Sequence, residues 1–297
     1  VKCDLCPRKC LVDRKKGEKG ICGQTENLKV ARAALHFWEE PCISGDAGSG
    51  AVFFSGCPLH CVFCQNENIA NGTVGKEISL ERLVDIFLEL QEKRANNINL
   101  VTPGHFVPQI VKALDQAKKE GLTLPVVYNT SSYETVDTIK MLEGYVDIYL
   151  PDFKYMSPVL SKKYSHAPDY AEVAKAAIAE MVRQTGKAVF VNGEEDNLIL
   201  SGTIVRHLTL PGCMADSMQI LKYLHETYGD MIYISIMNQF TPLSNLEKYP
   251  ELNRRITDEE YETLVDYAIE IGIENGFIQE GNTAEESFIP AFDCEGV

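Results

Sequence analysis

The sequence predicts an α/β fold, namely a partial (β/α)6 TIM-like barrel preceded by a small N-terminal cysteine-rich metal-binding unit. Short β-branched and aromatic runs alternate with helical patterns between residues 51 and 240. This alternation is typical of a parallel sheet with right-handed crossovers. A complete eight-unit barrel usually takes about 250 residues, so the available length favours a partial barrel. Four cysteines within the first 24 residues indicate a separate unit.

The elements follow in a regular order. Strands are expected at residues 51–55, 98–102, 125–129, 146–150, 204–210 and 231–236, and helices at 80–94, 107–120, 133–143, 170–185 and 216–228. The first helix has apolar residues at i, i+3, i+4, i+7 and i+8, beginning at Leu80. Residues 187–203 predict a hairpin leading into the fifth strand, and residues 258–271 predict a late helix.

This pattern divides the chain into four segments. We expect a cysteine-rich metal-binding unit at 1–24, a connecting segment at 25–50, the partial barrel at 51–240 and a C-terminal helical extension at 241–297.

Composition excludes several classes of protein. The chain has 297 residues, 45% of them hydrophobic, and a formal net charge of −15, which disfavours direct binding of nucleic acid. No apolar stretch reaches the length of a membrane span, and the first residues do not resemble a signal peptide. Ten cysteines without a secretion signal indicate a reducing compartment and metal ligation. We therefore expect a cytoplasmic, oxygen-sensitive protein without a membrane partner.

The N-terminal unit carries cysteines spaced C-x2-C-x3-C-x11-C, namely Cys3, Cys6, Cys10 and Cys22. The glycines among them permit the turns that aim several thiolates at one point. A segment this short has too little apolar content to hold itself, so a bound metal would supply folding energy. Structural zinc and a second iron–sulfur cluster are both compatible with four thiolates. The alternative is four unliganded thiols.

The most informative motif is the C-x3-C-x2-C spacing of Cys57, Cys61 and Cys64, directly after the first expected strand. Thiolates from one tight loop can converge on a cubane iron–sulfur cluster, and three ligands leave one iron open. A zinc site would lack a fourth ligand, a redox C-x-x-C pair would leave Cys57 unused, and three cysteines cannot all pair locally. The spacing therefore favours a [4Fe-4S] cluster.

With Phe63 directly before its third cysteine, this motif resembles the signature of the radical S-adenosylmethionine (SAM) superfamily. The resemblance implies that SAM binds the open iron. One electron then cleaves SAM to methionine and a 5′-deoxyadenosyl radical, which abstracts a hydrogen atom from a substrate. It also implies a reducing partner such as flavodoxin or ferredoxin.

Polar or turn-forming residues follow the expected strands, where parallel barrels place functional groups. We therefore expect a ligand-filled mouth at these strand ends. The segments are the Cys57 loop, Thr102-Pro103-Gly104-His105, Asn129-Thr130-Ser131, Pro151-Asp152-Phe153-Lys154, Pro211-Gly212-Cys213 and Asn238-Gln239.

Residues 51–240 are similar to the pyruvate formate-lyase activating-enzyme branch of that superfamily. Asp152-Phe153-Lys154 resembles its SAM-contacting Asp-Leu-Lys motif, and Arg206, in a segment that ends Pro211-Gly212, falls at a SAM-contacting position. Asn129-Thr130-Ser131 loosely matches a Thr-Asn-Gly turn. Thr102-Pro103-Gly104 stands where the superfamily has Gly-Gly-Glu, which holds the amino group of SAM. We expect backbone carbonyls, Thr102 or His105 to replace that glutamate.

The resemblance thus assigns a set of cofactor-binding residues, for which ordinary ion pairs and a structural histidine are the alternatives. The set is Phe63, Thr102, Pro103, Gly104, His105, Asn129, Asp152, Lys154 and Arg206.

Cys213 is the candidate catalytic residue, as a hydrogen-atom donor to a substrate radical or a ligand of a second cluster. The alternative is a free thiol that packs as a small hydrophobe. The substrate expected from the resemblance is a protein glycine, with a small molecule or a peptide side chain as the alternative. A non-catalytic electron carrier or a zinc-stabilised interaction protein is the rival class. A barrel with a polar rim favours the enzyme.

Overall fold

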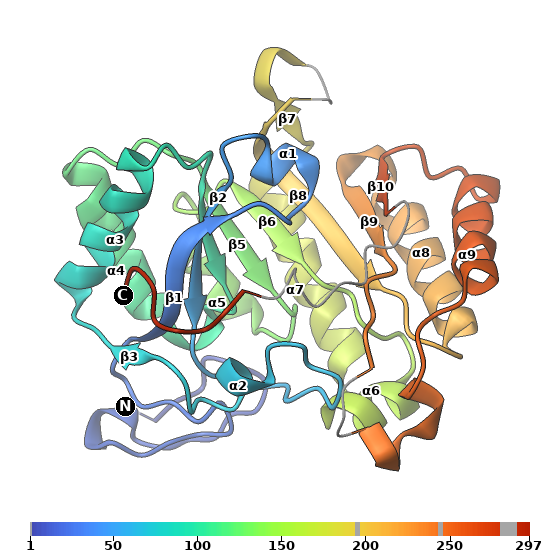
Figure 1. Cartoon of the computed structure of the whole chain (residues 1–297), viewed down its shortest axis with the longest axis horizontal. Coiled ribbons are helices and arrows are strands. Elements are labelled where there is room, and N and C mark those ends of the chain that lie inside the picture. The colour runs from blue at the N-terminus through green and yellow to red at the C-terminus, as the bar shows by residue number, and fades with distance from the viewer. Residues whose placement is uncertain (1, 194–196, 243–245, 280–289) are drawn as a thin grey trace.

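The computed structural model describes residues 2–193, 197–242, 246–279 and 290–297. Within them, one ten-stranded sheet forms the centre of the molecule, in the order β10-β9-β8-β6-β5-β4-β2-β1-β3, with β7 paired to β8 (Figure 1). The strands are β1 (Lys29–His36), β2 (Ser49–Phe54), β3 (Lys76–Glu77), β4 (Ile98–Val101), β5 (Val126–Thr130), β6 (Ile148–Pro151), β7 (Val189–Phe190), β8 (Ile199–Leu208), β9 (Tyr233–Met237) and β10 (Gly276–Ile278).

The six strands predicted from sequence form the parallel part of this sheet, from β2 through β4, β5, β6 and β8 to β9. The predicted hairpin is present as the antiparallel pairing of β7 with β8, although residues 194–196 lie outside the described residues. The α/β prediction with a partial parallel barrel is confirmed.

Three strands were not predicted. β1 lies in the stretch assigned as a connecting segment and pairs antiparallel with both β2 and β3. β10 lies in the expected helical extension and continues the parallel sheet beyond β9. In the described residues the sheet thus has β3 at one edge and β10 at the other, and these two edges do not pair to close a barrel.

The helices are α1 (Pro41–Ser44), α2 (Glu67–Ala70), α3 (Leu80–Glu92), α4 (Val107–Lys119), α5 (Val136–Lys140), α6 (Pro158–Ser165), α7 (Tyr170–Thr185), α8 (Met214–Tyr228) and α9 (Asp258–Glu270). The longer ones show why the periodicity predicted them. In α3, for example, Leu83, Phe87 and Leu90 are buried, while Ser79 caps the helix by accepting a hydrogen bond from the Arg82 backbone N–H.

The predicted helix at 133–143 is shorter in the structure, because Thr135 acts as the N-cap of α5. Apolar faces of α3 and α4 pack on β2, β4 and β5, and those of α7, α8 and α9 pack on the β8–β9 side. The loop after β2 and the N-terminal residues lie at the same, lower end of the sheet in Figure 1. This end therefore places the two cysteine-rich segments near one another.

Candidate active site

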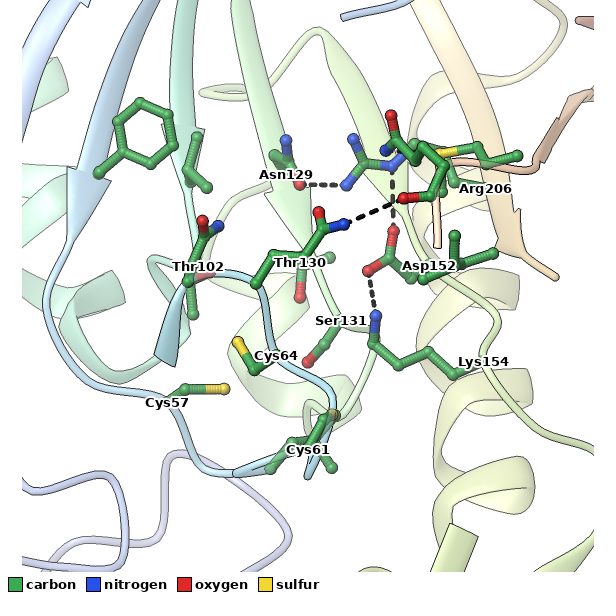
Figure 2. A pocket seen from close by; sticks show the side chains of 18 of the residues that line it. Cys57, Cys61, Cys64, Thr102, Asn129, Thr130, Ser131, Asp152, Lys154 and Arg206 are labelled. Carbon is green, nitrogen blue, oxygen red and sulfur yellow. Dashed lines mark hydrogen bonds and ion pairs between the residues drawn. The ribbon is translucent and has the colours of Figure 1, made fainter. Parts of the chain in front are cut away.

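A cavity of about 260 Å³ lies at the end of the sheet where the parallel strands terminate. The three cysteines of the loop after β2 line it, together with residues from the ends of β4, β5, β6, β8 and β9. Figure 2 shows the cysteine side chains gathered on one side of this cavity and Asp152, Lys154 and Arg206 on the other. The structure thus brings together residues separated by about half of the chain.

Backbone contacts fix the cysteine loop. Gly56 opens it with a φ of 94°, a conformation that glycine adopts without steric cost. Its N–H donates to the Ile69 carbonyl at 2.7 Å, and the Val62 N–H donates to the Tyr164 carbonyl at 2.9 Å. Gln65 Nε2 donates to the Gln239 carbonyl at 3.0 Å. The loop is therefore tied to α2, to α6 and to the end of β9.

Phe63 anchors the same loop through aromatic packing. Its ring is 6% exposed and makes edge contacts with Tyr155, Tyr164 and Phe240 at centroid distances of 6.0–6.5 Å. This geometry is favourable for aromatic pairs. Phe63 also lines the cavity, and its contact with a cofactor stays a prediction.

The electrostatics of the three thiols indicate what they can hold. Burial, and then repulsion from Cys61, raises the pKa of Cys57 to about 11, and the same causes raise the pKa of Cys64 to about 12. Thiolates at this place therefore require cations among them. No three His, Cys, Asp or Glu side chains of the described residues surround a single-ion site. Since each cysteine of a cubane binds a different iron, the donor set fits a [4Fe-4S] cluster.

Across the cavity, Arg206 on β8 joins the ends of three strands. Its Nε donates to Asp152 Oδ1 at 3.0 Å and its Nη2 to Asn129 Oδ1 at 2.6 Å. Lys154 Nζ donates to the second oxygen of Asp152 at 2.6 Å. Burial alone would raise the pKa of Asp152, but the Lys154 and Arg206 cations hold it below its ordinary value. Asp152 is therefore an anion clamped between two cations.

Glu39, which sequence reasoning missed, completes this network. Its carboxylate accepts from Arg206 Nη1 at 3.0 Å, from Asn99 Nδ2 at 3.0 Å and from Asn129 Nδ2 at 3.2 Å. It lies just after β1, the strand that the sequence did not predict, so no local pattern pointed to it. Asp152 and Glu39 raise the pKa of Arg206 against the opposite effect of burial. Arg206 thus fixes the positions of three side chains at this side of the cavity, namely Asp152, Glu39 and Asn129.

Residues 51–199 match the family model of the radical SAM superfamily. The chain belongs to the radical SAM superfamily. An uncharacterized protein of Methanocaldococcus jannaschii is 28% identical over 275 residues, which cover 90% of this chain and 74% of the relative. Membership implies SAM and a [4Fe-4S] cluster, for which the three cavity thiols are a fitting ligand set.

Solved structures share the fold of this radical SAM protein at low sequence identity. Streptococcus suis SuiB bound to S-adenosylmethionine has a TM-score of 0.51 and 13% identity, with 75% of this chain and 48% of SuiB covered. Methylornithine synthase has a TM-score of 0.52 and 15% identity, with 75% and 60% covered. The [FeFe]-hydrogenase maturase HydG has a TM-score of 0.51 and 15% identity, with 76% and 50% covered. The chain thus spans about half the length of SuiB and HydG.

In this radical SAM protein the β4 end differs from the expectation. Thr102, with a φ of 55°, lines the cavity, whereas Pro103, Gly104 and His105 are not among its lining residues. The His105 ring turns away to Ser55, with Nε2 2.7 Å from the Ser55 carbonyl oxygen. Burial lowers the pKa of His105 to about 3. His105 therefore supports the strand that precedes the cysteine loop, and its geometry is that of a structural histidine.

A carboxylate does lie behind this segment, but it comes from Glu134. A Cβ added to Gly104 would sit 2.6 Å from Glu134 Oε2. The Glu134 carboxylate accepts from Thr130 Oγ1 at 2.6 Å and from the Tyr128 hydroxyl at 2.9 Å. Burial raises its pKa in spite of these hydrogen bonds. Glu134 supports Thr130, which itself lines the cavity.

Cys213, the predicted catalytic residue, is also not among the residues that line the main cavity. It lines a small neighbouring hollow together with Tyr155, His207 and Asp216, and this hollow shares Lys154 with the main cavity. Burial raises its pKa to about 11. The structure places it on the far side of Lys154, so direct contact with a substrate in the main cavity is not what the geometry favours.

The four N-terminal cysteines lie close enough to influence one another. Burial raises the pKa of Cys6 to about 12, and Cys22, Cys10 and Cys3 add to this increase. Arg8 ties the unit to the barrel by donating to the carbonyls of Pro58 at 2.9 Å, His166 at 2.6 Å and Ser165 at 3.1 Å.

Among the helices that the structure describes, none combines the length and the apolar character needed to span a membrane.

Proposed function

We propose that this protein is a cytoplasmic enzyme that cleaves SAM reductively in order to abstract a hydrogen atom from a substrate. The observation that carries the proposal is the single cavity with three thiols on one side and a clamped ion network on the other. When bound, the [4Fe-4S] cluster and SAM supply the one-electron cleavage that yields methionine and the hydrogen-abstracting 5′-deoxyadenosyl radical. A reducing partner supplies the electron.

The residues of the cavity have different roles in this reaction. Cys57, Cys61 and Cys64 hold the cluster. Lys154, whose Nζ is held by Asp152 and whose side chain is 16% exposed, offers positive charge to the carboxylate of SAM. Thr102 and the residues 129–131 offer oxygen acceptors to its amino group.

Arg206 also serves as a positioning residue, and since it lines the cavity, its direct contact with SAM stays a prediction. Its guanidinium is bonded to Asp152, Asn129 and Glu39, so it orients side chains that border the cavity. The resemblance had assigned it a direct contact with SAM.

For the substrate we propose a glycine residue of a partner protein, on the similarity of the Asp152-Phe153-Lys154 step and the Arg206–Gly212 segment to the activating-enzyme branch. The cavity rim includes Trp38, which is 59% exposed and offers an aromatic surface to a polypeptide. A peptide side chain is the second candidate, because SuiB, which is similar in fold, has been solved with its precursor peptide SuiA. A small molecule is the remaining alternative.

We also propose that Cys3, Cys6, Cys10 and Cys22 hold a second metal centre, either zinc or an iron–sulfur cluster. Their thiols lie close enough to influence one another's pKa, which supports this proposal. As at the Cys57 loop, no three of them in the described part of the chain surround a single-ion site. Metal and sulfide analysis of anaerobically purified protein separates zinc from iron–sulfur. The Cys6→Ala variant should lose this metal and keep the spectrum of the first cluster, and simultaneous loss of both signals would contradict two independent sites.

The function is tested by anaerobic reconstitution, reduction and addition of SAM. Formation of 5′-deoxyadenosine by the wild type, and its absence from the Cys61→Ala variant, is the expected result. An intact cluster that yields no 5′-deoxyadenosine with any of several reductants would favour a non-catalytic iron–sulfur protein. An electron paramagnetic resonance signal of a glycyl radical on an added protein would support the glycine substrate.

A further inference from the structure

The N-terminal unit differs in charge from the rest of the molecule. Residues 1–24 contain seven Lys and Arg against three Asp and Glu, which is a formal charge of +4, whereas the whole chain carries −15. A cationic region on a strongly anionic protein attracts anionic partners to that region and repels them elsewhere. The position of this region therefore decides where an acidic protein approaches.

The cations of the unit fall into two groups. Arg8 and Arg14 point inward and attach the unit to the barrel, Arg8 through three carbonyls and Arg14 through the carbonyls of Thr25 and His105. The other group is exposed and consists of Lys2, Lys9, Lys15, Lys16 and Lys19. Lys15 and Lys16 make ion pairs at 4.0 Å, and no carboxylate of the described residues is paired with the remaining three. Their charge is thus available to a partner.

Two of these lysines and two exposed apolar residues belong to the two short segments that meet at Cys10. Lys9 and Leu11 flank Cys10 in the chain, Gly20 packs against its sulfur, and the Ile21 N–H donates to its Sγ at 3.3 Å. Leu11 is 52% exposed and Ile21 is 49% exposed. We call Lys9, Leu11, Lys19 and Ile21 the Cys10 patch. Apolar contacts within a cationic rim are the composition of a protein-docking surface.

The acidic residues of the unit do not cancel this charge. Asp4 and Glu18 are exposed, but the Glu18 carboxylate turns back to accept a hydrogen bond from the Asp13 N–H at 2.7 Å. Because seven Lys and Arg outnumber the three acidic residues, the unit keeps its net positive charge.

This patch lies next to the loop that holds the cavity cysteines. The Ile21 carbonyl oxygen is 2.7 Å from His60 Nε2, between Cys57 and Cys61. The Cys22 carbonyl packs against Gly56, where a Cβ would come within 2.5 Å of it. Arg8 reaches the Pro58 carbonyl at 2.9 Å. A partner on the Cys10 patch would thus stand close to the backbone of the cysteine loop, and no described residue of the unit lines the cavity.

We propose that the Cys10 patch is the docking surface for an acidic one-electron carrier protein. The inference rests on the proposed function, since that function needs an electron at the Cys57 loop. The carrier is oxidised by one electron and the [4Fe-4S] cluster is reduced by one, with no atom or proton transferred. Entry from this side leaves the cavity free for SAM and substrate. A nucleic acid would be repelled by the acidic remainder of the chain and has no use for the apolar pair.

The test compares rates of cluster reduction in the reconstituted full-length protein. Reduced [2Fe-2S] ferredoxin is the donor in one arm and flavodoxin hydroquinone in the other, and the bleaching of the cluster absorbance is followed by stopped flow. The Lys9→Glu/Lys19→Glu variant should show a roughly tenfold lower second-order rate constant at low salt. The wild-type rate should fall towards that of the variant as ionic strength rises.

The control variant is Lys187→Glu/Lys222→Glu, which changes the net charge equally. Lys187 comes two residues before β7 and Lys222 lies on α8, and Figure 1 shows β7 and α8 far from the N-terminus. It should keep a wild-type rate. Iron and sulfide content and the urea midpoint establish that both variants are folded and loaded. The salt series on the unaltered protein keeps the test valid if the first variant does not fold.

Photoreduced 5-deazariboflavin, an uncharged small reductant, separates the two proposals. If it reduces the cluster of all three proteins equally and SAM is cleaved, the function stands. Equal carrier rates for the Cys10-patch variant and the control then overturn the docking surface. The docking surface is also refuted if single-stranded RNA binds the wild type and not the Cys10-patch variant, because that result assigns the patch to a nucleic acid. If 5-deazariboflavin reduces the cluster and no SAM is cleaved, the proposed function fails instead.

Discussion

Replacement of Arg206 by methionine should destabilise the protein strongly, because it would leave the buried Glu39 carboxylate without a cation and Asp152 with Lys154 alone. The side chains of Arg206, Glu39 and Asp152 are 14%, 9% and 16% exposed. Removal of one partner from such a buried network costs about 3–5 kcal/mol. Unfolding entropy is about 2.1 cal/mol/K per residue, so for 297 residues the melting temperature should fall by roughly 5–8 °C.

The assay is anaerobic thermal unfolding of the loaded protein, followed by circular dichroism. Arg254→Met is the matched control, because Arg254 is 44% exposed and pairs with Glu260 at 2.6 Å, a surface pair worth at most about 1 kcal/mol. The Arg206→Met/Glu39→Gln double variant should recover part of the loss, since it removes the Glu39 charge that Arg206→Met leaves without a cation. Equal melting temperatures of Arg206→Met and Arg254→Met would refute the buried network.

Three further predictions concern single residues of the site. Cys61→Ala should abolish the first cluster, because two thiolates cannot hold it; retained iron, sulfide and absorbance would end the assignment. Lys154→Ala should weaken SAM binding about tenfold with the cluster spectrum unchanged, given the loss of one charge-assisted contact, while the exposed Lys162→Ala should bind SAM like the wild type in equilibrium dialysis. His105 stays neutral in the folded protein because its pKa there is about 3. The unfolded chain therefore binds the proton first, and the free energy of unfolding decreases as pH falls below about 6.5. His105→Gln should remove about 0.8 kcal/mol of the loss between pH 8 and pH 6, and identical pH slopes in urea titrations would contradict this.

Much of the fold could be predicted because its signals are local. The helix at 80–94 shows its buried stripe in its own residues, and the six parallel strands are short apolar runs between such helices. β1 (Lys29–His36) was not predicted because its small and charged residues show no strand pattern, and this segment forms a strand only by pairing with β2. β10 has three residues, too few for any periodicity.

At the site, too, some residues could be predicted from local sequence and others only from contacts between distant segments. The cysteine spacing and the Asp152–Lys154 step are close in sequence, and the structure places both at the cavity. His105 was assigned to the cavity from its place after a strand, but the backbone at Thr102, with a φ of 55°, turns the following residues away. Glu39 reaches Arg206 from 167 positions away in the chain, a contact that no local pattern can indicate.

The residue spacing alone fixes that the three thiols lie close together, because eight residues span them however the rest of the chain folds. Folding sets which charges face the Cys57 loop, which polar residues turn inward, and that the cationic N-terminal unit contacts the backbone of this loop. These outcomes depend on strand order and on side chains brought together from distant segments, and the free energy of burying them is shared among partners that no single stretch of sequence contains.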